Sequence, residues 1–180
     1  MAATVLFINR NDLVKNTIID GNVQADKLMH FVKIAQEIHI QHYLGTDLYD
    51  KIGSLINANT IAGTVYETLL VEHVQPMLIH YAMVDYLPFA AYQIKQGGIF
   101  KHISENAETV EKNEVDYLVQ KERDMAEYYT RRFIQFMDFN QSSYPEYTSN
   151  TNDDIYPDQD SPTFNGWVLW KHINLSKKTL

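Results

Sequence analysis

Apolar residues recur at three- and four-residue spacing through most of this chain, which predicts a helical protein. The first such stripe predicts a helix over about 23–44, with inner positions Leu28, Phe31, Ala35 and Ile38. Gly45 follows the last periodic residue, and a second amphipathic run over about 47–57 predicts the next helix.

The chain is organised around the corner that these two helices make. Its residues are Leu44, Gly45, Thr46, Leu48 and Tyr49. Glycine has no Cβ and therefore suits the left-handed conformation that often ends a helix. We expect the Thr46 hydroxyl to cap the second helix, with the negative charge of Asp47 in its first turn. The corner predicts tight packing and contains no nucleophile, general base or phosphate-binding group.

Two longer helices follow. One begins near Thr64, and Pro76 is expected to kink or restart it because proline removes a backbone donor. Its apolar face continues to Ile94, with a further bend at Pro88, until the glycine pair at 97–98 ends it. After a polar connection at 99–107, the longest helix covers about 109–139. Its predicted inner stripe is Val115, Leu118, Val119, Met125, Ala126, Tyr129, Phe133, Phe136 and Met137.

These patterns predict an all-α fold, a compact bundle of about four to five helices. We divide the chain into an N-terminal arm (1–20), a helical domain (21–140) and an extended C-terminal interaction segment (141–180). The β-prone run at 4–8, which holds Val5 and Phe7, predicts an extended arm; the alternative is that it packs on its own domain. Asn9 or Asn11 is expected to cap a short turn.

The composition changes after Asn140. Residues 141–165 hold three of the five prolines and no Lys or Arg, yet they carry large aromatic side chains. Tyrosine and tryptophan are enriched where proteins contact each other. We therefore expect contacts with neighbouring subunits or other proteins; the alternative is that the tryptophans fold back on the helices. Together with Val5 and Phe7, the candidate contact residues are Tyr144, Tyr147, Tyr156, Phe164, Trp167 and Trp170.

Composition narrows the function classes. The chain has 180 residues, no cysteine and a formal net charge of −8. Disulfides and thiolate metal sites are therefore excluded. An acidic protein is a poor generic DNA binder, because such binding comes from neutralising phosphates with Lys and Arg. The sequence shows no apolar run near the roughly 20 residues of a membrane span and no signal-peptide pattern, so no membrane association is expected.

Candidate chemistry is sparse. His39 and His42 share one helix face, but zinc needs a third and fourth ligand, and no H-E-x-x-H motif is present. Acidic pairs such as Asp153–Asp154 lack the glycine and final Glu of an EF-hand loop. Glycine-rich nucleotide-binding motifs and the G-x-S-x-G motif are absent from the sequence. We therefore predict no catalytic, cofactor-binding or metal site, and a protein that is not an enzyme.

Two packing motifs resemble a known family. The corner reads A-Q-x-x-x-I-x-x-x-L-G-x-x-L-Y over 35–49, after Asn16-Thr17 and D-G-N-V at 20–23. A second segment reads V-Q-P-M-L-I-H-Y-A over 74–82, followed by Y-L-P at 86–88. Over residues 4–140 the chain resembles the head–tail connector (neck ring) proteins of crAss-like tailed bacteriophages.

This resemblance implies a structural virion protein, assembled in the host cytoplasm and placed in the neck between capsid and tail. It implies a ring of twelve copies stacked below the portal, whose lumen passes DNA without specific binding. The implied partners are copies of the chain, the portal protein and further neck and tail proteins. A head-to-tail interface closes into a ring when its rotation divides the circle evenly. The alternative is a small acidic helical protein-binding or regulatory module that works as a monomer or dimer.

Overall fold

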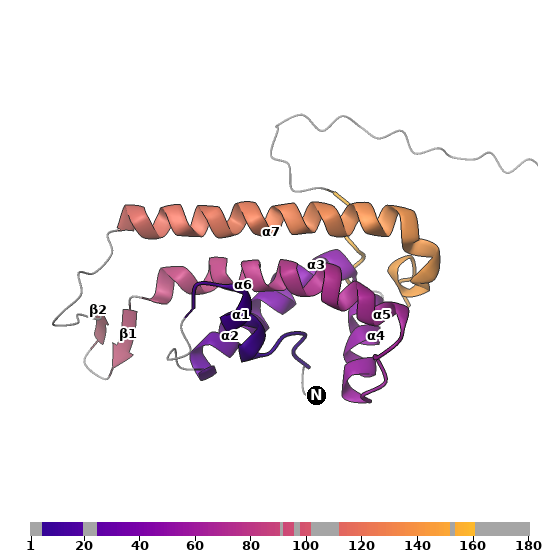
Figure 1. Ribbon diagram of the computed structural model, residues 1–180, viewed down its shortest axis with the longest axis horizontal. Coiled ribbons are helices and arrows are strands. Elements are labelled where there is room, and N and C mark those ends of the chain that lie inside the picture. Colours follow the sequence, from indigo (N-terminus) through magenta and orange to yellow (C-terminus); the bar gives the residue numbers. More distant parts are fainter. Residues whose placement is uncertain are drawn as a thin grey trace, which may run out of the picture.

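The computed structural model describes residues 5–19, 25–90, 92–95, 98–101, 112–151 and 154–160. These residues confirm the predicted all-α bundle, to which a small β-hairpin is added (Figure 1). The α-helices are α1 (Arg10–Asn16), α2 (Ala25–Ala35), α3 (Gln41–Leu44), α4 (Thr46–Asn57), α5 (Val65–Leu69), α6 (Gln75–Ala90) and α7 (Lys112–Asn140). The π-helical turns η1 (Gln36–Ile40) and η2 (Leu70–Val74), the 3-10 turns η3 (Gln141–Ser143) and η4 (Pro145–Tyr147), and the strands β1 (Tyr92–Lys95) and β2 (Gly98–Lys101) complete the described elements.

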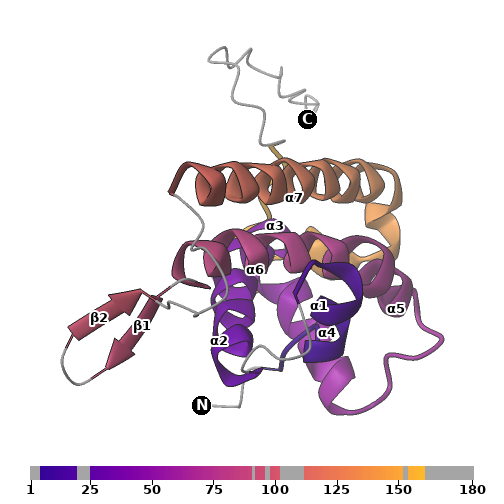
Figure 2. The same ribbon diagram turned by 60° about the vertical axis from the view of Figure 1, so that its left-hand side comes forward.

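The two longest helices define the architecture. Helix α7 lies along α6 and forms one outer layer, while α1, α2 and α4 lie on the opposite side of α6 (Figures 1 and 2). The core between these layers is apolar and fully buried; it includes Leu28, Leu48, Met77, Leu78, Met83 and Phe133. Within the described residues, no helix has both the length and the apolar character needed to cross a membrane.

The first helical run, α2–η1–α3, is continuous but does not keep a single period. Ile38, predicted to face the core, is 61% exposed, while Ile40 is fully buried. The π turn explains this error, because it accommodates one extra residue and shifts the inner face along the sequence. The backbone amide of Gln41 accordingly donates to the carbonyl of Gln36, five residues back.

The second run, α5–η2–α6, stays helical through Pro76, where the sequence predicts a kink or a restart; α6 begins one residue before this proline. Pro76 is the second residue of α6, and the π turn η2 immediately precedes α6. The amide of Gln75 donates to the carbonyl of Leu70, again five residues back. A widened turn next to a residue that lacks an N–H lets the helical run continue past that residue.

The end of this run differs from the prediction. We expected helix to continue to Ile94, but α6 ends at Ala90, and 92–95 pairs antiparallel with 98–101, with Tyr92 opposite Lys101. Pro88 stands in the last turn of α6, where a missing donor favours an end to the helix. Aromatic and β-branched residues such as Tyr92 and Ile94 then favour a strand.

The N-terminal arm packs on its own domain, which was the alternative interpretation. Phe7 and Ile8 are buried in the core. Asn9 caps α1, as one of the two expected caps: its side chain accepts hydrogen bonds from the amides of Asn11 and Asp12. The arm and α1 therefore belong to the same packed body as the other helices.

The inner stripe of α7 is confirmed over its second half. Ala126, Phe133 and Met137 are buried against α6 and its neighbours. Met125 was expected on the same face but is 39% exposed. Phe139 and Asn140 end the helix, and the chain turns through η3 and η4 without leaving the body.

Candidate functional site

The predicted corner exists, and its glycine has an unusual conformation. Leu44, Thr46 and Leu48 are buried, and Gly45 separates α3 from α4 with φ 72° and ψ 161°. This is positive φ, as expected, but it is the extended region that essentially only glycine adopts, not the left-handed helical one. The Gly45 amide donates to Gln41 O over 2.8 Å, and the Tyr49 amide donates to Gly45 O over 3.1 Å.

Thr46 does not cap α4 as predicted, because it is already the first helical residue. Its hydroxyl donates to Asp154 Oδ2 over 2.9 Å and accepts from Gln41 Nε2 over 3.2 Å. The Thr46 amide donates to the carbonyl of Ile155 over 3.0 Å. A carbonyl from a distant part of the chain thus accepts a hydrogen bond from the first amide of α4, which has no acceptor within the helix.

That distant segment, residues 149–151 and 154–158, crosses the corner, and we call it the strap. The carboxylate of Asp47 accepts from Ser149 Oγ at 2.7 Å and from the amide and hydroxyl of Thr151, both at 2.9 Å. The Asp158 amide donates to His42 O over 3.0 Å, and the Asp158 carboxylate lies 3.0 Å from His42 Nε2. The strap therefore binds both helix ends that meet at Gly45.

Pro157 of the strap lies directly on Gly45. A Cβ at position 45 would lie 2.6 Å from both Cδ and Cγ of the proline ring. Two separate causes therefore require a glycine at position 45: the backbone conformation and the close approach of the Pro157 ring.

Two glutamines in the motif segments hold the N-terminal arm. Gln36 is fully buried; its Oε1 accepts from the Phe7 amide over 2.7 Å, and its Nε2 donates to Val5 O and to Tyr49 Oη, each over 2.8 Å. Gln75 Nε2 donates to Phe7 O over 2.8 Å. Each motif thus supplies one glutamine that pairs with the backbone of the arm, as buried polar groups require.

Replacing Gln36 with leucine is expected to destabilise the protein. It leaves the buried Phe7 amide without its acceptor, and each such group costs about 1–3 kcal/mol. Thermal unfolding of the full chain measures this loss. Gln120→Leu is a matched control on the exposed surface of α7, where the glutamine donates a hydrogen bond to Asp124 one turn along the same helix; equal melting temperatures for the two variants would contradict the role of Gln36.

The predicted partner contacts separate into three groups. Phe7, Tyr144 and Tyr147 are buried in the chain's own core, so the expectation that they contact partners is wrong. Tyr144 Oη donates to Val65 O over 3.1 Å, and burial raises the pKa of Tyr147 to about 12. Val5 is partly buried, whereas Tyr156 is exposed on the strap. Phe164, Trp167 and Trp170 lie outside the described residues.

The histidines have separate partners. His39 stacks on Tyr81 with ring centroids 4.1 Å apart, whereas His42 faces the strap. His80 Nδ1 lies 2.7 Å from the Glu122 carboxylate between α6 and α7. Burial lowers the pKa of His73, which stacks on Phe136. Among the described residues, no three His, Asp or Glu side chains gather as a metal site requires.

The double variant His39→Ala/His42→Ala is expected to keep its fold. The His42–Asp158 pair is largely exposed, and such pairs contribute at most about 1 kcal/mol. Total metal analysis and circular dichroism of both proteins test this expectation. Stoichiometric zinc in the wild type that the variant loses would show that these histidines bind metal.

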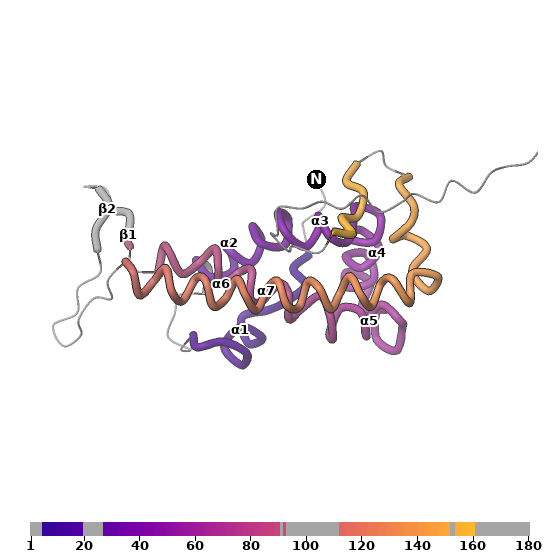
Figure 3. The backbone as a smooth tube through the Cα atoms, turned by 90° about the horizontal axis from the view of Figure 1, so that it is seen from above, coloured from indigo at the N-terminus to yellow at the C-terminus, as the bar shows by residue number. Residues whose placement is uncertain are grey.

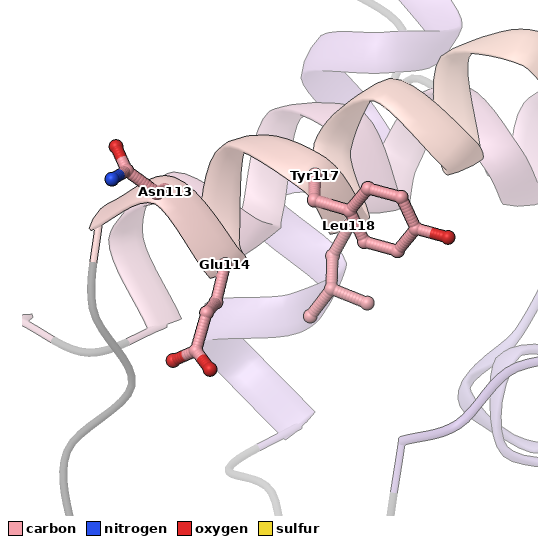
Figure 4. A pocket seen from close by; sticks show the side chains of 4 residues that line it. All are labelled: Asn113, Glu114, Tyr117 and Leu118. Atoms are coloured by element: carbon pink, nitrogen blue, oxygen red, sulfur yellow. The ribbon is translucent and has the colours of Figure 1, made fainter.

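The outer face of α7 carries apolar side chains that the sequence interpretation missed. Tyr117, Tyr128 and Phe139 are 62%, 52% and 88% exposed. Tyr117 also lines a shallow open hollow with Asn113, Glu114 and Leu118 (Figure 4). The spacing of eleven residues between these aromatics is visible in the sequence and corresponds to three helical turns.

The chain belongs to the DUF6712 family, a family of unknown function, whose model matches residues 40–156. This match begins in η1 and ends in the strap, so it spans both partners of the corner contact. Searches of curated proteins and of solved structures found no match.

Proposed function

We propose that this chain is a structural virion protein, a head–tail connector that forms a ring below the portal, extends the DNA channel and joins head to tail. The proposal takes its ring of twelve copies, its virion location and its assembly in the host cytoplasm from the resemblance. Its partners would be further copies, the portal protein and other neck and tail proteins. We assign the chain no catalytic role.

The observation that carries the proposal is what the resembling motif builds. Ala35, Gln36, Ile40, Leu44 and Leu48 are all fully buried. They position the arm, the corner and, through it, the strap. Because the motif residues are buried, they fix the fold of the subunit and leave its outer surface available for contacts with neighbouring molecules. A connector subunit in a ring needs such contacts.

Two further features support the proposal. The large aromatics on the outer face of α7 are typical of contact surfaces between proteins. The net charge of −8 suits a lumen through which DNA slides without binding, because like charges repel.

Protein stoichiometry in purified virions tests the proposal. Virions of the phage that encodes this chain should contain the chain in the same copy number as the portal protein, as measured by quantitative mass spectrometry. Absence of the chain from mature virions would contradict the connector function and favour a regulatory or binding module.

A further inference from the structure

The β-hairpin projects from the helical body. It follows the end of α6 and lies beyond one end of the layers that α6 and α7 form (Figures 1 and 2). In the part of the chain that the structure describes, β1 and β2 pair with each other as a two-stranded sheet, and no helix packs extensively against either strand. A two-stranded hairpin by itself is marginally stable in water and gains stability by packing on another surface. The hairpin therefore needs a contact that the described body of its own chain does not provide.

The hairpin is basic and apolar in a chain that is acidic. Residues 92–101 contain Lys95 and Lys101 and no Asp or Glu, whereas the whole chain has a net charge of −8. Tyr92, at the start of β1, is 51% exposed. The apolar residues of the two strands are Tyr92, Ile94, Ile99 and Phe100. A complementary partner would combine negative charge with exposed apolar side chains.

The opposite end of the molecule is acidic. Helix α4, the turn η4 and the strap, which we call the acidic end, lie toward the end of the long axis away from the hairpin (Figures 1 and 3). Over α4 and residues 141–160 the sequence has one basic residue, Lys51, against the carboxylates of Asp47, Asp50, Glu146, Asp153, Asp154, Asp158 and Asp160. The neighbouring half of α7 does not offset this charge, because over 127–140 Glu127 and Asp138 balance Arg131 and Arg132.

The acidic end also exposes apolar side chains. Ile155 and Tyr156 of the strap are 37% and 51% exposed. The hydrogen bonds from the strap to Thr46 and Asp47 hold these two side chains at a fixed place on the surface. This surface therefore has both properties that complement the hairpin, negative charge and exposed apolar groups.

These two surfaces lie toward opposite ends of one molecule (Figures 1 and 3). A surface that meets a different surface on the next copy forms a head-to-tail interface, and such interfaces generate rings or filaments. The pairing of two hairpins with each other is disfavoured, because it would bring Lys95 and Lys101 of both copies together.

We propose that the β-hairpin of one copy binds the acidic end of the next copy. This inference deepens the proposed function and rests on the ring assembly proposed there. It gives the hairpin the packing surface that its own chain does not supply, and it gives the strap a second purpose besides stability. Because the contact joins opposite charges, association of the wild type should weaken as the salt concentration is raised.

A complementation experiment tests the pairing with full-length chains. The hairpin variant is Lys95→Glu/Lys101→Glu; the acidic-end variant is Asp50→Lys/Asp160→Lys, whose two sites are exposed. Each variant alone is expected to associate at least about tenfold more weakly than the wild type, with an unchanged melting temperature. Mixed together, they should form a dimer and nothing larger, because each retains the surface that the other lacks. Sedimentation velocity over a wide concentration range measures these states.

Lys15→Glu/Lys33→Glu is the matched control. It reverses two exposed lysines on α1 and α2, outside both surfaces, and it changes the net charge as much as the hairpin variant does; it should associate like the wild type. Association that survives in both test variants would overturn the pairing while leaving the connector function open to its virion test. A wild type that remains monomeric at every concentration would also overturn the pairing. So would duplex DNA binding that the hairpin variant loses without any change in self-association, because the hairpin would then be a nucleic-acid surface.

Discussion

A chain that ends at Asn140 is expected to lose most of its stability. The truncation removes Tyr144 and Tyr147, which are buried in the core. It also removes the strap, whose Ile155 carbonyl accepts a hydrogen bond from the first amide of α4. Loss of one buried aromatic side chain costs about 3–5 kcal/mol, and whole domains are stable by only about 5–15 kcal/mol. Circular dichroism and thermal unfolding should therefore show a largely unfolded or aggregated protein.

A chain that ends at Asp160 is the control for this truncation. It keeps η3, η4 and the strap, and it should unfold at the temperature of the full chain. A chain ending at Asn140 that melts like the full chain would show that residues 141–160 are not part of the core. That result would support the prediction, made from composition alone, that residues 141–180 form a separate interaction segment.

Gly45→Val is expected to be the most damaging single substitution at the corner. Positive φ with extended ψ costs a non-glycine residue about 1–3 kcal/mol. The new Cβ also displaces Pro157, and with it the strap. Thermal unfolding should show a large fall in melting temperature, and the strap should become more sensitive to proteolysis.

Alanine substitutions separate the two causes. Gly45→Ala and Gly63→Ala both place a side chain at positive φ, but a Cβ at Gly63 meets nothing within 4 Å. The first should therefore cost more than the second, and replacing Pro157 with glycine should reduce the difference. Gly53→Ala, within α4, should be neutral or stabilising. Equal costs at positions 45 and 63 would mean that Pro157 does not press on the corner.

The helices were predictable because their signals are local. Periodic apolar residues, Asn9 as a cap and Gly45 at positive φ each act through neighbours in sequence. The prediction fails where a π turn changes the period: Ile38, in the predicted inner stripe, is exposed, while Ile40, outside that stripe, is buried. The polar residue Gln36 lies within this apolar run, at the start of the π turn. It is fully buried, and a buried amide must find hydrogen-bond partners, which here are in the N-terminal arm and Tyr49.

The contact between the corner and the strap could not be predicted in the same way. Thr46 and Asp154 are 108 residues apart, and no local pattern pairs a threonine with one particular distant carboxylate. The polar composition of 141–160 pointed to a separate tail, but its polar groups are used to satisfy helix ends. Tyr144 and Tyr147, interpreted as partner contacts, are core residues, whereas Tyr156 is exposed.

A reconstruction of the virion neck by cryo-electron microscopy tests the connector function most directly. With the structure fitted as a rigid body, we predict a closed ring of this chain below the portal. A neck reconstruction in which no layer fits this chain would contradict the account.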